Sequence, residues 1–178
     1  MTDQPPTDQA AQDGAAPVYT PTDVPIVVNL QYVKDLSFEN PRAPQSLTSG
    51  SAPEVAVKVD VTADNVGGES FEVVVHVVAN ATAGGETVFL LELSYAGVFT
   101  FQNVPREQMR PLCLIECPRL MFPFVRNVVA EATREGGFPP LLINPIDFAE
   151  LYRRTAERTA AATEAAAPAP APAAPADA

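Results

Sequence analysis

Two carboxylates, Asp35 and Glu39, lie four residues apart in a segment whose polar and apolar residues alternate as they do in a half-buried strand. Successive side chains of a strand point to opposite faces, so an unbulged strand would place both carboxylates on one face, toward water. Such a pair suits either acid–base catalysis or the docking of a basic partner. Because nothing in the sequence supplies a pocket or a substrate for catalysis, docking and a plain solvated face are the interpretations that remain.

The other residues with reactive side chains do not form a recognisable active site. His76, the only histidine, lies among valines of another predicted strand, where a hydrogen-bonded structural histidine is the simpler interpretation. Cys113 and Cys117, the only cysteines, are expected to be buried, reduced thiols, and too few ligands accompany them for a metal site. The sequence also lacks a nucleophile elbow and a phosphate-binding loop. We therefore expect no enzymatic activity, no cofactor and no metal.

The composition is strongly acidic, with 22 Asp and Glu against 11 Lys and Arg among 178 residues and a net charge of −11. A negative surface repels nucleic acid and anionic membranes and favours basic or unfolded polypeptides as partners. No apolar run reaches the roughly 18–20 residues that span a bilayer, and the N-terminus does not resemble a secretory signal. We therefore expect a cytoplasmic protein that binds no nucleic acid and does not insert directly into membranes.

Four segments show strand patterns, at residues 24–38, 54–64, 70–82 and 86–101. Glycine-containing turns at 65–68 and 84–85 connect the last three, and consecutive strands with short turns predict an antiparallel meander. Helical spacing, interrupted by several prolines, follows from Pro105 to Gly136, and a last helix begins near Asn144. The predicted fold is therefore α+β, a four-stranded antiparallel meander with two C-terminal helices packed on one side.

Composition divides the chain into three parts. Residues 1–22 are rich in Pro, Gln, Asp, Thr and Ala, and residues 164–178 are rich in Ala and Pro, so both are expected to be disordered tails. The domain between them, residues 23–163, carries more apolar side chains than one chain can cover, because both faces of the strand at 86–101 are apolar. A closed homo-oligomer is the simplest cover for this excess.

Three stretches resemble the bacterial export chaperone SecB in order and in spacing. They are YVKDLSFENPRAP at 32–44, GGETVFLLELSYAGVF at 84–99 and CPRLMFPFVRNVVAEATREGGFPPLLINPIDFAELY at 117–152. The resemblance implies an ATP-independent chaperone that binds unfolded secretory precursor proteins in the cytoplasm, keeps them translocation-competent and delivers them to the SecA translocation motor. It also implies a homotetramer built as a dimer of dimers.

The resemblance assigns roles to individual residues by their match to the family's positions. Motor binding falls on Asp35, Glu39, Leu90 and Glu92, and oligomerisation falls on Leu91, Leu93 and Tyr95, for which ordinary core packing is the alternative. We propose a client groove lined by apolar side chains of the first strand, the loop at 138–143 and the last helix: Tyr32, Phe38, Phe138, Leu141, Leu142, Ile143, Phe148 and Tyr152. The Ala/Pro tail departs from the polar, acidic tails found in the family, so a secondary motor contact is either shifted to residues 152–158 or absent.

Two other functions fit the same sequence. An oligomeric module with this fold could serve a different client, such as an antitoxin, and an apolar sheet face could enclose a small molecule or a lipid. The intact acidic residues Asp35, Glu39 and Glu92 favour the export chaperone over the first alternative. A preformed closed pocket in a monomer would favour the second.

Overall fold

The structure of the protein is a computed structural model that describes residues 25–48, 50 and 52–165. The predicted N-terminal tail (1–22) lies outside the described residues, and so does the predicted C-terminal tail from residue 166 onward. The last helix continues to Ala165, beyond the domain end predicted at residue 163.

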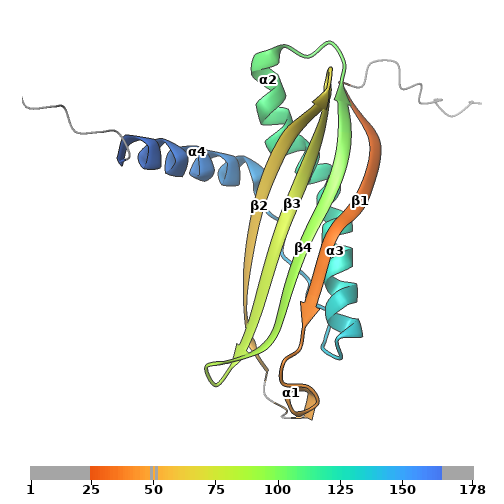
Figure 1. The fold of residues 1–178 in the computed structure, drawn as a ribbon, viewed down its shortest axis with the longest axis vertical. Helices are drawn as coiled ribbons and strands as arrows, with labels where there is room; N and C mark the ends of the chain where they lie inside the picture. Colours follow the sequence, from red (N-terminus) through yellow and green to blue (C-terminus); the bar gives the residue numbers. More distant parts are fainter. Residues whose placement is uncertain (1–24, 49, 51, 166–178) are drawn as a thin grey trace, which may run out of the picture.

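A four-stranded antiparallel sheet forms one layer of the molecule, as predicted (Figure 1). Its strands are β1 (Ile26–Glu39), β2 (Glu54–Gly67), β3 (Ser70–Ala83) and β4 (Glu86–Phe101). Gly68 at φ 56° and Gly84 at φ 60° adopt the left-handed backbone that tight hairpin turns require. These two turns make β2, β3 and β4 a meander.

The prediction of a complete meander is wrong for β1. The strand order is β1-β4-β3-β2, so β1 pairs with β4 and not with β2, its neighbour in the sequence. The connection between β1 and β2 spans residues 40–53 and contains the short helix α1 (Gln45–Thr48), so it is much longer than a hairpin turn. It carries the chain from one edge of the sheet to the other and produces a Greek-key order.

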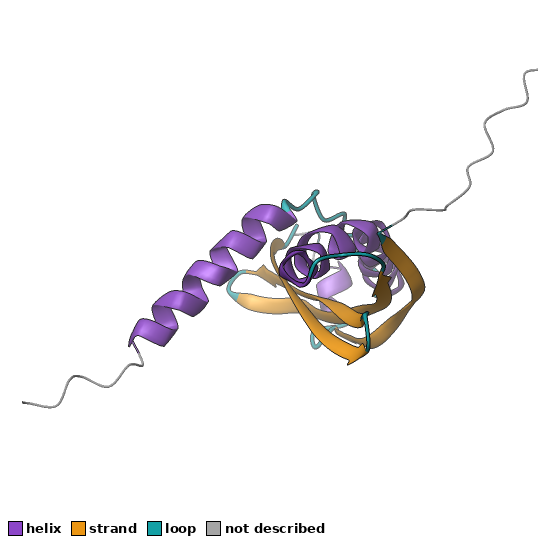
Figure 2. Cartoon of the chain, turned by 90° about the horizontal axis from the view of Figure 1, so that it is seen from above, coloured by secondary structure: helices purple, strands orange, loops and turns teal. Residues whose placement is uncertain are grey.

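The helical layer covers one face of the sheet, called the inner face below (Figure 2). It consists of α2 (Arg106–Pro111), the π-helical segment η1 (Leu112–Glu116) and α3 (Cys117–Glu135), which follow one another directly. Met121, Val125 and Val129 recur at helical spacing on α3 and are fully buried in the core. The predicted interruption takes the form of η1, which begins directly after Pro111, a residue that cannot donate a helical backbone hydrogen bond.

The last helix, α4 (Phe148–Ala165), does not lie along the sheet, so the prediction of two helices packed on one side is wrong for this helix. Its first turn is anchored, because Phe148 is buried and packs edge-to-face on Phe122 with 5.8 Å between the ring centroids. Beyond this anchor the helix projects away from the sheet (Figures 1 and 2). After Thr155 its sequence has no large apolar side chain that could hold it against the sheet.

The core lies between the inner face and the helical layer. Odd-numbered side chains of β3 and β4 point into it, among them Val73, Val75 and Phe99, none of which is exposed. The opposite side of the sheet, called the outer face below, presents the even-numbered side chains of the same strands.

Candidate functional site

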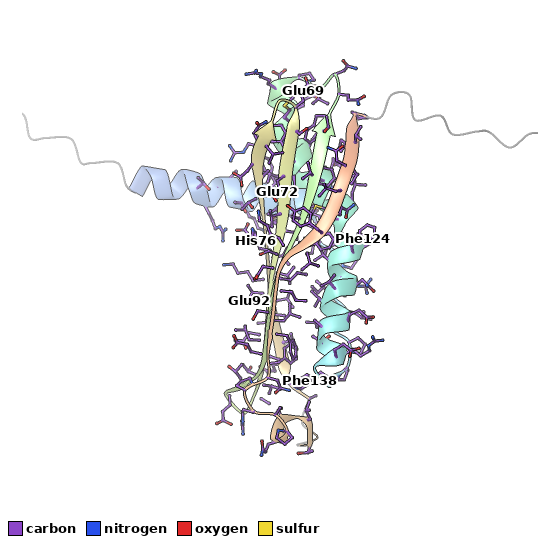
Figure 3. All side chains as sticks on the ribbon, turned by 45° about the vertical axis from the view of Figure 1, so that its right-hand side comes forward. Glu69, Glu72, His76, Glu92, Phe124 and Phe138 are labelled. Atoms are coloured by element: carbon purple, nitrogen blue, oxygen red, sulfur yellow. The ribbon has the colours of Figure 1, made fainter. Side chains whose placement is uncertain are left out.

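The outer face gathers the four residues predicted to dock a motor. Ser37 lies directly opposite Glu92, Glu39 lies opposite Leu90, and Asp35 is two residues before Ser37 on the same strand face. Directly opposed residues share a face of the sheet, so the three carboxylates and the leucine lie together. The carboxylates are exposed and Leu90 is half-buried; Figure 3 shows Glu92 on the side of the sheet away from α3. This arrangement can attract a basic protein surface and add an apolar contact to it.

β1 reaches this arrangement through two bulges. At Asn29 and at Lys34 one extra residue interrupts the pairing with β4. The expectation that Asp35 and Glu39 share a face assumed a strand without bulges. It holds because both bulges precede Asp35 and the strand is regular from there to Glu39.

The bulge at Lys34 separates two residues that the sequence pattern placed on one face. Tyr32 pairs with Ala96 on the outer face, whereas Phe38 pairs with Leu91 on the inner face. The two aromatic side chains therefore cannot line the same client groove within one chain.

Tyr32 and Lys34 reach across β4 to a glutamate on β3. Tyr32 Oη donates a hydrogen bond to Glu72 Oε1, and Lys34 Nζ lies 2.6 Å from Glu72 Oε2. Hydrogen bonds from Lys34 and Tyr32 hold the pKa of Glu72 below its usual value, and the same carboxylate raises the pKa of both partners. Lys34 thus neutralises the charge of Glu72, which distinguishes Glu72 from the exposed carboxylates of the outer face.

His76 occupies the middle of the outer face on β3 (Figure 3). Its Nδ1 lies 3.0 Å from Ser94 Oγ and its Nε2 lies 3.3 Å from Thr62 Oγ1, so both ring nitrogens have hydroxyl partners. Asp60 is the directly opposed residue on β2. These contacts agree with the interpretation of His76 as a hydrogen-bonded structural histidine.

The residues matched to the family's oligomer-sensitive positions lie in the core of the chain itself. Leu91 is 0 %, Leu93 2 % and Tyr95 8 % exposed, all on the inner face. Their predicted role in the interface stays a prediction. From these positions they would act on assembly through the packing of α3 and not by direct contact with another chain.

The proposed client-groove residues do not gather in one place. Phe38 and Phe138 form an aromatic cluster with Phe89, whose ring centroid lies 5.5 Å from that of Phe38 and 4.9 Å from that of Phe138. Ile143 and Phe148 are buried. Core and groove are built from the same apolar residue types, so the sequence pattern could not separate them.

The remaining groove residues are accessible but lie apart. Leu142 is 59 % exposed in the loop before α4. Leu141 is half-buried, and its backbone N–H donates to Thr133 Oγ1 at 2.9 Å. Tyr152 is half-buried on α4, where it lines a small pocket with residues of η1 and β2.

A cleft of about 880 Å³ opens between the β2–β3 turn and the helices α2 and η1, and sequence reasoning missed it. Most of its wall is apolar, with contributions from Val61, Ala63, Phe71, Val104, Met109 and Leu114. Two arginines of α2, Arg106 and Arg110, also line it. In the sequence these apolar residues are indistinguishable from core residues of strands and helices. The cleft arises from the position of α2 relative to the end of the β2–β3 hairpin, which the sequence pattern does not report.

Apolar side chains also remain open on α3 and on β1. On α3, Leu120 is 47 % and Phe124 is 52 % exposed, one helical turn apart. Figure 3 labels Phe124 on this helix. On the edge strand β1, Val28, Val33 and Leu36 are each exposed by 43–45 %. Groups of exposed large apolar side chains are typical of sites where another protein binds.

An antiparallel sheet with one helix-covered face, one open acidic face and uncovered apolar surface defines a protein-binding module. The sequence pattern described as "Preprotein translocase subunit SecB" matches residues 20–159. A protein-export protein SecB of Paramagnetospirillum magneticum is 57 % identical over 136 residues, which cover 75 % of this chain and 87 % of that protein. The corresponding protein of Afipia carboxidovorans is 47 % identical over 161 residues, covering 90 % of this chain and 94 % of that protein. The chain belongs to the SecB family.

A solved structure shows the same fold. It is a SecB-like chaperone of Mycobacterium tuberculosis in complex with a peptide from the HigA1 antitoxin, and it matches with a TM-score of 0.54. The two sequences are 16 % identical, and the match covers 68 % of this chain and 90 % of that one. Within the described part of this chain, no helix is both long enough and apolar enough to cross a membrane.

Proposed function

We propose that this protein is an export chaperone that holds unfolded precursor proteins in the cytoplasm without ATP and delivers them to the SecA translocation motor. The observation that carries the proposal is the grouping of Asp35, Glu39, Leu90 and Glu92 on one open face, in a chain of the SecB family. Close relatives over most of this chain are named protein-export proteins, which supports the same function.

The outer face is the proposed docking surface for SecA. Asp35, Glu39 and Glu92 are exposed, and none of the three enters an ion pair among the described residues. Unpaired carboxylates on a rigid sheet accelerate encounter with a basic surface and set its orientation. Leu90 beside them adds an apolar contact that a purely electrostatic complex would lack.

Client binding is proposed for the open apolar surfaces. The cleft beside α2 is large enough for several apolar side chains of an extended polypeptide, and its arginines suit the backbone carbonyls or acidic groups of a client. Leu142 and Tyr152 are the residues of the predicted groove that remain accessible to a client at the α4 end of the molecule. Several weak, sequence-tolerant sites favour the unfolded state of the client by mass action.

A homotetramer, arranged as a dimer of dimers, is the proposed assembly. It would cover the exposed apolar residues of α3, Leu120 and Phe124, and the open edge of β1. Uncovered strand edges and apolar stripes are both liabilities for a monomer and are commonly removed by closed assembly. Multiple client sites in one assembly would then act together on a single long precursor.

The test has two parts. Light scattering on the purified protein, with and without a reduced, unfolded precursor, should give a mass of four chains that rises by one precursor. SecA binding should then be lost in the double variant Asp35→Lys with Glu39→Lys, while precursor holding is retained. The control is Glu107→Lys, which reverses an exposed charge on α2, away from the outer face.

Each outcome distinguishes a different failure. A monomer that ignores unfolded chains would contradict the chaperone function. Loss of both precursor holding and SecA binding in the double variant would show that the substitutions disrupt folding or that the docking site is assigned wrongly. Full SecA binding by the double variant would contradict the assignment of the docking surface but not the chaperone function.

A further inference from the structure

β1 is an edge strand whose hydrophobic pattern does not determine its register. On the outer face, Leu30 is 49 % and Tyr32 is 36 % exposed, and on the inner face Val33 is 45 % and Leu36 is 44 % exposed. Register is strongly specified where one face of a strand is buried, because a slip by one residue exchanges the two faces. Within one chain neither face of β1 is buried in its middle section, and Phe38, which packs on the inner face, comes only after it. Another feature must therefore set the position at which the strand changes face.

The bulge at Lys34 is the point where that position is decided. Val33 lies opposite Tyr95, and Asp35 lies opposite Ser94, the adjacent residue of β4. Without the bulge, strict alternation would turn Asp35 to the inner face whenever Tyr32 stays on the outer one. The extra residue allows both side chains to lie on the outer face.

A contact with β3 holds the bulge. Tyr32 and Lys34 belong to β1 and Glu72 belongs to β3, so their contact passes over β4, which lies between the two strands. One oxygen of the carboxylate accepts from Tyr32 Oη, and the other lies 2.6 Å from Lys34 Nζ. The residue of β4 opposite Tyr32 is Ala96, which is fully buried and small enough for a long side chain to pass over it.

We infer that Glu72, through Tyr32 and Lys34, is a positioning group that sets the register of β1 and so presents Asp35 and Glu39 on the outer face. This inference rests on the proposed docking function of that face and extends it to residues that need not touch the motor. The Glu72 carboxylate binds both Lys34, the extra residue of the bulge, and Tyr32, two positions before it. These two contacts hold the bulge in place, and the bulge keeps both Tyr32 and Asp35 on the outer face.

Lys34 is the diagnostic residue because its two possible roles, as a charge and as a positioning group, predict opposite changes in SecA affinity when it is replaced. Replacing a lysine by glutamine makes the outer face more negative, and charge alone would then strengthen the attraction for a basic partner. If Lys34 holds the bulge, the same substitution frees β1 to shift and weakens docking. The sign of the change therefore decides between the two roles.

Lys58 provides a matched control. It is exposed on β2, opposite Val78, which is itself opposite Glu92, so it lies on the same outer face. It enters no ion pair among the described residues. Lys58→Gln makes the same change in charge as Lys34→Gln without touching the bulge.

The experiment titrates purified SecA with the full-length wild type, Lys34→Gln, Glu72→Gln and Lys58→Gln in low-salt buffer. We expect Lys34→Gln and Glu72→Gln to raise the Kd by at least about threefold, as expected when coupled neighbours are separated, and Lys58→Gln to leave it unchanged or lower it. Hydrogen exchange measures the local stability of the β1 pairing without SecA: amides of residues 33–39 should exchange faster in the two bulge variants and at the wild-type rate in Lys58→Gln.

The outcomes separate this inference from the proposed function. Tighter SecA binding by Lys34→Gln, or wild-type exchange rates at 33–39 in that variant, would overturn the positioning role even if wild-type docking is confirmed. If the wild type does not bind SecA at all, the docking function fails. The exchange rates then still decide whether Glu72 holds β1 in its pairing at the bulge.

Discussion

Phe38 of β1 lies against Gly136 at the end of α3, so closely that a Cβ added at residue 136 would come within 2.3 Å of the phenyl ring. Gly136 has a φ of −72°, which any residue can adopt, so the close approach and not the backbone conformation requires glycine here. Phe38 is followed directly by Glu39 of the acidic face. The contact therefore ties the docking half of β1 to the helical layer.

Gly136→Ala should destabilise the protein by about 1–3 kcal/mol, because the added methyl must displace the Phe38 ring from its aromatic cluster. Urea unfolding at a fixed protein concentration measures this change. In a Phe38→Leu background, where the smaller side chain leaves room, the same substitution should cost less. A Gly136→Ala chain as stable as the wild type, or an equal cost in both backgrounds, would contradict the role of the contact.

The Tyr32–Glu72–Lys34 contact should make stability depend on pH in a defined direction. The folded pKa of Glu72 lies below its usual 4.5, so its contribution is complete above that value and is lost as the pH falls through the folded pKa. The folded pKa of Lys34 lies above its usual 10.5, so its contribution is present below that value and is lost as the pH rises through the folded pKa.

Thermal unfolding of the wild type and of Glu72→Gln across pH checks this direction. The difference in Tm between them should be constant between about pH 6 and pH 9 and should shrink below about pH 4.5, where Glu72 begins to take up its proton. A difference that grows on acidification would mean that another group dominates.

The alternation of apolar residues was enough to predict the four strands and the shared face of Asp35 and Glu39. Val55, Val57, Val59 and Val61 alternate with polar residues, and β2 indeed has its odd-numbered side chains toward the inner face. Asp35 and Glu39 share a face for the same reason of strand geometry. These features depend on neighbouring residues, which is the range over which sequence patterns carry information.

The pairing of β1 could not be predicted in the same way. Short glycine turns specify which strands are adjacent, as at Gly84, whereas the residues at 40–53 allow β1 to lie at either edge of the sheet. The bulge at Lys34 could not be predicted either, because its stabilising partner Glu72 is distant in sequence. The cleft and the projection of α4 likewise depend on how helices lie relative to strands, which local periodicity does not report.

Cys113 and Cys117 should resist modification in the native protein. Burial raises the pKa of the Cys113 thiol to about 11 and raises that of Cys117 still further. At pH 8 only about one Cys113 thiol in a thousand would be ionised, even before steric protection is considered. A thiol reagent such as DTNB should react slowly without denaturant and fully in urea, and fast reaction in the native protein would contradict the buried positions of the two thiols.

Phe124 offers the sharpest test of assembly, because its side chain is half exposed on a helix whose opposite side forms the core. Phe124→Asp places a charge in any interface that covers α3 without altering the core residues Met121 and Val125. If α3 is the contact between chains, the variant should dissociate to a smaller assembly at micromolar concentration with unchanged circular dichroism, because an unpaired buried charge is strongly unfavourable. Leu142→Asp makes the same kind of change at a 59 % exposed leucine outside α3 and should keep the wild-type mass. If Phe124→Asp keeps the wild-type mass, the exposed residues of α3 are not the subunit contact, and the open edge of β1 becomes the candidate.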